Sequence, residues 1–219
     1  MVSIYPYSDY RLRQKKCKLI YRVLRHSRST FVFKEYMDIN ECLDIYNGLL
    51  NKRIVIHLED ETVVNLHFTR NNIKHLLGLH KLLDIPMLQN DGRVVYNILS
   101  NGIITDKQIK KSKYFNNISE RFLYFCLLPE LLHSEIIIDF DSSLCSFNNY
   151  ETKLKKTKYI LYKKIPDTYY VAHLCLSQNI NKNKPNSYYP ETFFIEHSNK
   201  YLSGQALLKV TSVDIIELI

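Results

Sequence analysis

The order of the hydrophobic patterns along this chain constrains its fold more than any other feature of the sequence. Apolar residues recur at helical spacing through much of residues 31–132, whereas β-branched and apolar runs bounded by turn residues follow from residue 135 onward. One hairpin pattern interrupts the first part, where residues 53–58 and 63–68 flank an acidic turn at 59–61. The chain is therefore predicted to be an α+β protein, with its helices in the first half and antiparallel strands after them.

Spacing, capping and turn residues predict the individual elements. The expected helices are residues 31–50, 73–83, 105–111 and 118–132, the last of them shortened or kinked by Pro129. The expected later strands are residues 135–140, a hairpin of 158–163 with 171–177, and a second hairpin of 192–196 with 201–210. A decorated loop is expected between residues 84 and 101.

Positive charge is concentrated at the N-terminus of the 219-residue chain. Residues 1–28 contain eight basic side chains and one acid, a net charge of +7, whereas the whole chain carries +8. Residues 9–26 suit a basic amphipathic helix that binds RNA phosphates, an acidic partner or a membrane surface, or that packs its apolar stripe on the body. We treat residues 1–28 as a basic amphipathic segment and residues 29–219 as one domain.

Hydropathy and cysteine usage predict a soluble cytoplasmic protein that does not enter a membrane. No apolar run approaches the roughly 20 residues of a membrane span, and the basic N-terminus lacks the apolar stretch of a signal peptide. The five cysteines are odd in number, scattered and never spaced as CxxC. This usage favours reduced, mostly buried thiols over a disulfide framework or a structural zinc site.

A second basic stretch lies within the body of the protein. Residues 153–164 contain six lysines and no acid, and tyrosines are interleaved with them. Ammonium groups and aromatic rings on one sheet face suit single-stranded nucleic acid, because they meet phosphates and stack on bases. The same lysines would equally protect an edge strand without binding any ligand.

Several catalytic signatures are absent from the sequence, and two other chemistries remain. The chain has no GxGxxG, P-loop, GxSxG or HExxH pattern, and its five glycines could not supply a phosphate-cradling loop. Asp139 and Asp141 share a face at a strand end, so they either hold Mg²⁺ for phosphoryl transfer or merely terminate the strand. The other chemistry is RNA cleavage by the 2′-hydroxyl, which needs a proton shuttle and donors for the developing charge.

Two residues suit cleavage by the 2′-hydroxyl. His75 points away from the apolar face of the expected helix 73–83, whereas His80 lies on that face and is interpreted as a packing residue. Arg121 flanks the apolar stripe of the most hydrophobic helix, so its guanidinium must be paired or must face a cleft. Arg121 is therefore either a phosphate clamp or one half of a structural salt bridge.

Five short stretches of the chain match, in order, the motifs of one nuclease group. Residues 68–79, FTRNNIKHLLGL, resemble the pattern F…NF.HLTGL, and residues 120–122 resemble an RI helix start. Residues 156–162 resemble the strand DYLLY, residues 189–194 resemble YPRTFF, and residues 201–205 resemble Y..GQ. On these motifs most of the chain resembles phage-associated nucleases of the barnase–EndoU–colicin–RelE-like (BECR) group.

The resemblance implies a BECR-like fold, with helices packed on a twisted antiparallel β-sheet, and metal-independent RNase activity without a cofactor. It also implies a toxin or conflict protein of a phage or mobile element, with RNA as partner and a cognate antitoxin or inhibitor as a further one. His75, Arg121 and Thr192 match motif positions, and Gln205 is a further match. Leu77 replaces a preferred Thr. Lys158 replaces a frequent Asp, which either removes an acid that orients a base or adds a cation that faces phosphate.

The first functional hypothesis is an endoribonuclease. It assigns His75 as general acid/base, Arg121 as phosphate stabiliser and Thr192 as a hydrogen-bonding catalytic residue. The residues expected to bind RNA are Lys156, Lys158, Tyr159 and Gln205. Two alternatives stay open: a non-catalytic module on the same fold that binds RNA or an acidic partner, and a metal-dependent phosphoryl-transfer enzyme that uses Asp139 and Asp141.

Overall fold

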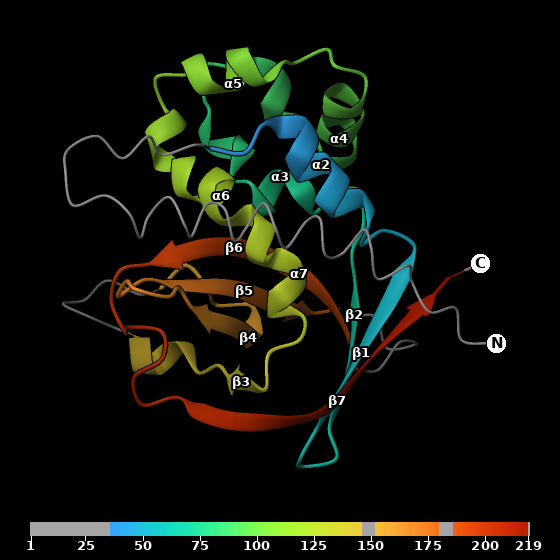
Figure 1. Ribbon diagram of the computed structural model, residues 1–219, viewed down its shortest axis with the longest axis vertical. Coiled ribbons are helices and arrows are strands. Elements are labelled where there is room, and N and C mark those ends of the chain that lie inside the picture. Colours follow the sequence, from blue (N-terminus) through green and yellow to red (C-terminus); the bar gives the residue numbers. More distant parts are fainter. Residues whose placement is uncertain (1–35, 146–151, 180–185, 219) are drawn as a thin grey trace.

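Seven strands form a closed barrel in the computed structural model, which describes residues 36–145, 152–179 and 186–218. They follow one another around the barrel in the order β1-β2-β6-β5-β4-β3-β7. Figure 1 shows the helices gathered at one end of the barrel. The strands are Lys52–Leu58 (β1), Val63–His67 (β2), Ile136–Asp139 (β3), Thr157–Lys164 (β4), Val171–Gln178 (β5), Ser187–Glu196 (β6) and Ala206–Glu217 (β7).

The helical elements are short. The α-helices are Ile39–Asn47 (α2), Ile73–Leu76 (α3), Gly92–Ser100 (α4), Asp106–Lys111 (α5), Ser119–Tyr124 (α6) and Leu128–Leu131 (α7). The 3₁₀ turns are Leu79–Lys81 (η1), Pro86–Gln89 (η2), Phe115–Asn117 (η3), Phe125–Leu127 (η4) and Ser142–Cys145 (η5). Of these elements, α3 and α6 contact β6, and α7 contacts β4 and β5.

The closed barrel overturns the expected fold class. The sequence predicted helices packed on a twisted antiparallel sheet, but the sheet closes on itself and one of its strand pairs is parallel. Closure depends on β7, which pairs with β3 through its first residues and with β1 through the rest of its length. The parallel pair joins β2 to β6 at Asn65 opposite Ser187 and Leu66 opposite Tyr188. Neither pairing joins neighbours in sequence, so hairpin patterns could not predict it.

Two of the three predicted hairpins are confirmed. β1 pairs antiparallel with β2, and β4 pairs antiparallel with β5. The third hairpin, of residues 192–196 with 201–210, is wrong because β6 pairs with β5 and β2, whereas β7 pairs with β3 and β1.

Capping residues set the helix starts. Asp38 and Glu41 form a capping box for α2, which begins later than the predicted helix 31–50, and residues 31–35 lie outside the described chain. Thr105 and Gln108 form a second capping box and confirm the helix predicted from residue 105. The loop predicted over residues 84–101 is wrong, because Asp91 caps α4, whose Val95, Ile98 and Leu99 are buried.

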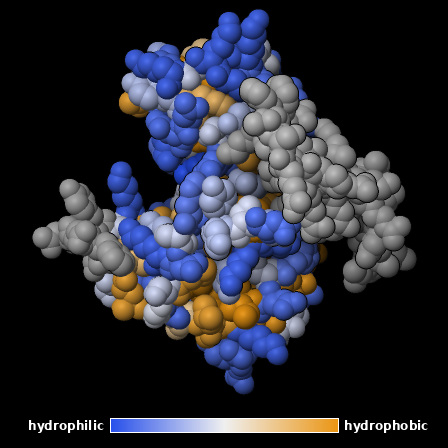
Figure 2. Space-filling view, turned by 60° about the vertical axis from the view of Figure 1, so that its left-hand side comes forward, coloured by the Kyte–Doolittle hydropathy of each residue, from blue (hydrophilic) through white to orange (hydrophobic). Residues whose placement is uncertain are grey.

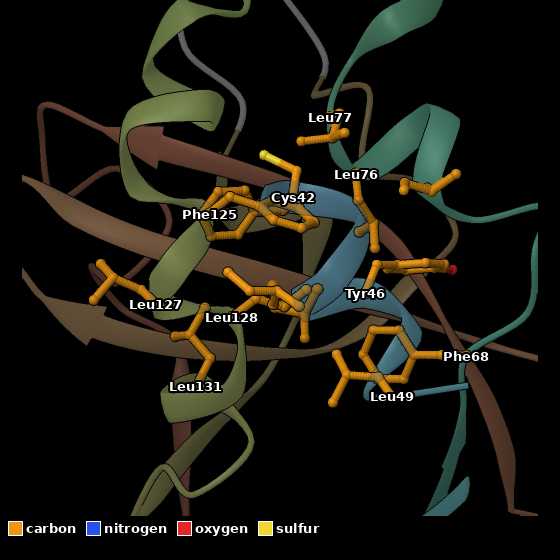
Figure 3. Close-up of a cluster of buried hydrophobic side chains, with 14 of the residues drawn as sticks. Cys42, Tyr46, Leu49, Phe68, Leu76, Leu77, Phe125, Leu127, Leu128 and Leu131 are labelled. Carbon is orange, nitrogen blue, oxygen red and sulfur yellow. The ribbon is translucent and has the colours of Figure 1, made fainter. Parts of the chain in front are cut away.

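The main core joins the helical end to the inward-facing strand residues. Figure 3 shows side chains of α2, including Cys42 and Tyr46, between those of α3 and those of η4 and α7. The predicted helix 118–132 is divided into α6, η4 and α7, with Pro129 in the first turn of α7, so the expected break is confirmed. Full burial of one large apolar side chain contributes about 1.5–3 kcal/mol, and this cluster therefore holds the helices on the barrel.

Three further predictions concern the cysteines, the membrane and the N-terminus. Cys42, Cys145 and Cys175 are buried free thiols, as expected, whereas Cys126 is disulfide-bonded, contrary to expectation. None of the described helices is long and apolar enough to span a bilayer. The basic segment 1–28 lies outside the described residues.

Candidate functional site

The helix that carries His75 ends early. Gly78 has a left-handed backbone, with φ of 71°, and separates α3 from η1, so the single helix predicted over residues 73–83 is wrong. A Cβ atom at Gly78 would lie 2.9 Å from Cγ2 of Ile118 and 3.1 Å from Nε of Arg121. Gly78 therefore both ends α3 and leaves room for Arg121 of α6 to reach its last turn.

Arg121 joins three segments that are far apart in the sequence. Its Nη1 donates hydrogen bonds to the carbonyl oxygens of His75 (2.6 Å) and Leu76 (3.0 Å) and to Oγ1 of Thr192 on β6 (3.3 Å). The last carbonyls of a helix lack partners within the helix, and the guanidinium satisfies two of them. The structure thus brings His75, Arg121 and Thr192 together, through the backbone of His75 and the side chains of the other two. We call these three residues the Arg121 cluster.

The Arg121 guanidinium is a buried cation with two unused nitrogens. Burial lowers its pKa to about 10, so it stays charged at neutral pH. Within residues 36–145, 152–179 and 186–218 no carboxylate forms an ion pair with it, so the structural salt bridge considered above has no partner there. All its hydrogen bonds to the described chain come from Nη1. Nε and Nη2 make no hydrogen bond to the described residues.

Two histidines lie side by side at this place. His75 is exposed and His80 is half-buried, and their ring centroids are 4.9 Å apart. Burial, Lys74 and Arg121 lower the pKa of His75, and Glu191 opposes them. Burial, His75 and Arg121 lower the pKa of His80 to about 4, and its Nδ1 is buried with no hydrogen-bond partner in the described part of the chain. Both rings are therefore neutral at pH 7.

A β-bulge lies next to Thr192. Cys175 of β5 pairs with Thr192, but the following Leu176 pairs with Pro190, so Glu191 is an extra residue in β6. Bulges bend a strand and redirect the side chain that they insert, and they are frequent next to active sites. The bulge thus inserts Glu191 next to Thr192, whose Oγ1 accepts a hydrogen bond from Arg121.

Helices and barrel meet where these residues come together. Figure 1 shows α3 and α6 directly above β6. Figure 2 shows the surface hollowed between the helical end and the barrel, with mostly hydrophilic residues around the hollow.

The residues predicted to bind RNA from β4 have other contacts. Nζ of Lys158 lies 2.6 Å from Oδ1 of Asp139, and neither side chain is bonded to the Arg121 cluster. Tyr159 is buried, and its ring packs on Tyr188 with centroids 5.4 Å apart, so it offers no free face to a base. Lys156 is exposed just before β4 and stays available to a phosphate.

Gln205 and the two aspartates form a separate structure after β3. The buried amide of Gln205 accepts a hydrogen bond from the backbone N–H of Asp141 (2.8 Å) and donates one to its carbonyl (3.0 Å). Hydrogen bonds with the side chain and with the backbone N–H of Ser143 lower the pKa of Asp141. No group of three or more His, Cys, Asp or Glu side chains suited to a metal ion occurs within the described residues. Gln205 thus orders a turn and has no hydrogen bond to the Arg121 cluster.

Comparison with known families identifies the chain. The family model described as phage-Barnase-EndoU-ColicinE5/D-RelE like nuclease 4 (PBECR4) matches residues 38–214. The chain belongs to this nuclease family. Curated proteins and solved structures gave no match. The resemblance drawn from the sequence is confirmed, and nucleic acid is the class of substrate that PBECR4 membership indicates.

The span that matches PBECR4 contains the whole Arg121 cluster and does not include residues 1–28. Within it, Glu191 was missed from the sequence. It stands inside the matched motif 189–194, but only the strand register shows that it is inserted as a bulge. His80 was interpreted from the sequence as a packing residue, because it lies on the apolar face of the expected helix 73–83. In the structure α3 ends early, and the His80 ring lies beside the His75 ring, which continuous helical spacing does not predict.

Proposed function

We propose that this PBECR4 protein is a metal-independent endoribonuclease in which His75 is the general acid/base and Arg121 and Thr192 stabilise the reacting phosphate. The setting implied by the resemblance completes the proposal: a toxin or conflict protein of a phage or mobile element, acting on RNA in the cytoplasm, with a cognate inhibitor. The observation that supports it best is the Arg121 guanidinium, because it is charged and buried, has no ion-pair partner in the described chain and has two nitrogens without a hydrogen bond to the described residues.

The reaction uses the neutral form of His75. The imidazole takes the proton of a ribose 2′-hydroxyl, and the 2′-oxygen attacks the adjacent phosphorus. As the P–O2′ bond forms, the bond to the 5′-oxygen breaks, and that oxygen takes a proton from water. The His75 imidazolium gives its proton back to the solvent, which leaves a 2′,3′-cyclic phosphate, a 5′-hydroxyl and the neutral ring. The lowered pKa of His75 keeps the base form populated at neutral pH.

Arg121 and Thr192 supply donors for the charge on the phosphorane. Nε and Nη2 of Arg121 are the unused nitrogens, and Nη1 holds the guanidinium in place through the α3 carbonyls. Thr192 Oγ1 accepts from Arg121 and keeps its own O–H to donate. Donors fixed in this way need no reorganisation when the charge develops.

Cleavage of a labelled single-stranded RNA by His75→Ala tests the proposal, with His133→Ala, an exposed histidine outside the cluster, as matched control. His75→Ala should lower the rate by about 10²–10⁴-fold. Arg121→Lys, which keeps the charge but not the planar fork, should lower it by about 10²–10³-fold.

Wild-type rates in a folded His75→Ala protein would remove His75 from the mechanism. RNA binding without any cleavage by the wild-type protein would favour the non-catalytic alternative.

A further inference from the structure

Glu191 is a carboxylate that the fold holds firmly in the candidate site. Its Oε2 accepts hydrogen bonds from Thr157 Oγ1 (2.7 Å) and from Ser177 Oγ. Thr157 and Ser177 are partners across β4 and β5. Two donors to one oxygen fix the position of the carboxylate.

The strand register shows which face of the sheet Glu191 occupies. Ser177 and Cys175 are two residues apart on β5 and therefore share a face, and Cys175 pairs with Thr192. The Glu191 carboxylate reaches Ser177, so it lies on the face that carries Thr192. Thr192 accepts a hydrogen bond from Arg121, and Arg121 also donates to the carbonyl oxygen of His75. Glu191 therefore lies on the sheet face that is connected to His75 through Thr192 and Arg121.

The charges around His75 come from four elements. Lys74 belongs to α3 itself, Arg121 to α6 and His80 to η1, and all three oppose protonation of the His75 ring or are neutral. Glu191 of β6 is the carboxylate that acts on His75 from the described residues, and its charge favours the protonated ring. Without a negative charge nearby, a proton accepted by His75 would have only cations and a neutral imidazole as neighbours.

We propose that Glu191 is a positioning residue that stabilises the His75 imidazolium while that ring holds the substrate's proton. The proposal rests on the proposed function for its role in cleavage, but the electrostatic coupling can be measured without substrate. The β-bulge is the structural reason for the coupling, because in a regular strand the adjacent residues Glu191 and Thr192 would point to opposite faces of the sheet.

The test is an NMR titration of the His75 ring in the wild-type full chain, in Glu191→Gln and in Glu191→Asp. Removing the carboxylate charge should lower the pKa of His75, and Asp, which keeps the charge, should bring it back toward the wild-type value. Glu61→Gln, in the β1–β2 turn, removes the same charge far from the site and is the control. Glu191→Ala gives the same readout if Glu191→Gln does not fold.

The pH–rate profile is the second readout. With His75 as base, the acidic limb of the profile should move to lower pH in Glu191→Gln, and the plateau rate should fall by up to about tenfold for each unit lost from the pKa of His75. An unchanged His75 titration in folded Glu191→Gln or Glu191→Ala would overturn the proposal even if the protein cleaves RNA. A lowered His75 pKa in a protein that shows no His75-dependent cleavage would instead overturn the proposed function and leave the coupling intact.

Discussion

At the residue scale, Arg121 connects stability to chemistry. One of its nitrogens satisfies the carbonyl oxygens at the end of α3, and the other two make no hydrogen bond to the described residues. Burying a cation costs free energy unless hydrogen bonds compensate it, and two backbone carbonyls and one hydroxyl do so here. His75 and Thr192 were named from the sequence because they match motifs, whereas the bonds that bring them to Arg121 depend on tertiary packing.

His80 predicts how stability depends on pH. Its pKa falls from 6.5 in the unfolded chain to about 4 in the folded protein. The unfolded chain then binds a proton that the folded protein does not bind, so the free energy of unfolding should decrease as the pH falls from about 6.5 to about 4. His80→Gln should flatten this decrease in urea titrations, leaving a smaller part that His75 contributes. The exposed His133→Gln serves as control, and equal slopes for wild type and His80→Gln would contradict the assignment.

At the element scale, turn residues and helix caps predicted those helices and hairpins whose signals lie within a few positions of one another. The β1–β2 hairpin and the α5 capping box are examples, because turn residues and caps act within a few positions. The helix predicted over residues 73–83 failed at Gly78, where packing against Ile118 and Arg121 requires a left-handed glycine. The Glu191 bulge escaped prediction because it exists only in the register between β5 and β6.

Gly78→Ala should test how far the site depends on the end of α3. The new Cβ would meet left-handed strain and also the side chains of Ile118 and Arg121, so the variant should lose about 1–3 kcal/mol of stability and part of its cleavage activity. Gly102→Ala is the matched control, since Gly102 also has positive φ but nothing within 4 Å of an added Cβ. Melting temperatures and cleavage rates of the two variants should differ, and equal losses would show that backbone strain alone matters.

At the scale of the whole molecule, barrel closure was beyond the reach of sequence patterns. The segments were largely recognised as strands, but β7 closes the barrel by pairing with β1 and β3, both of which are distant in sequence. Such pairings are selected by the fit of the whole core, which brings inward-facing residues of strands and helices into one cluster. Most element types and the partners within two local hairpins were therefore predictable, whereas the long-range strand partners were not.

The charge distribution leads to a prediction for the intact chain. Residues 1–28 carry +7 of the net +8, so a protein without them is nearly neutral. If this segment binds RNA phosphates, its removal should reduce the slope of log affinity against log salt by about 0.7 for each lost phosphate contact. Cleavage of short RNAs should change little. Equal salt slopes for the full chain and the shortened chain would assign RNA affinity to the barrel domain alone.

The chemical ends of the RNA products test the central claim most directly. RNA should be incubated with the full-length protein in excess EDTA, and the fragment ends should be determined by mass spectrometry. Attack by the 2′-hydroxyl, with His75 as base, predicts 2′,3′-cyclic phosphate and 5′-hydroxyl ends at an undiminished rate, and His75→Ala should remove both. Cleavage abolished by EDTA, or fragments with 3′-hydroxyl and 5′-phosphate ends, would contradict a metal-independent mechanism at the Arg121 cluster.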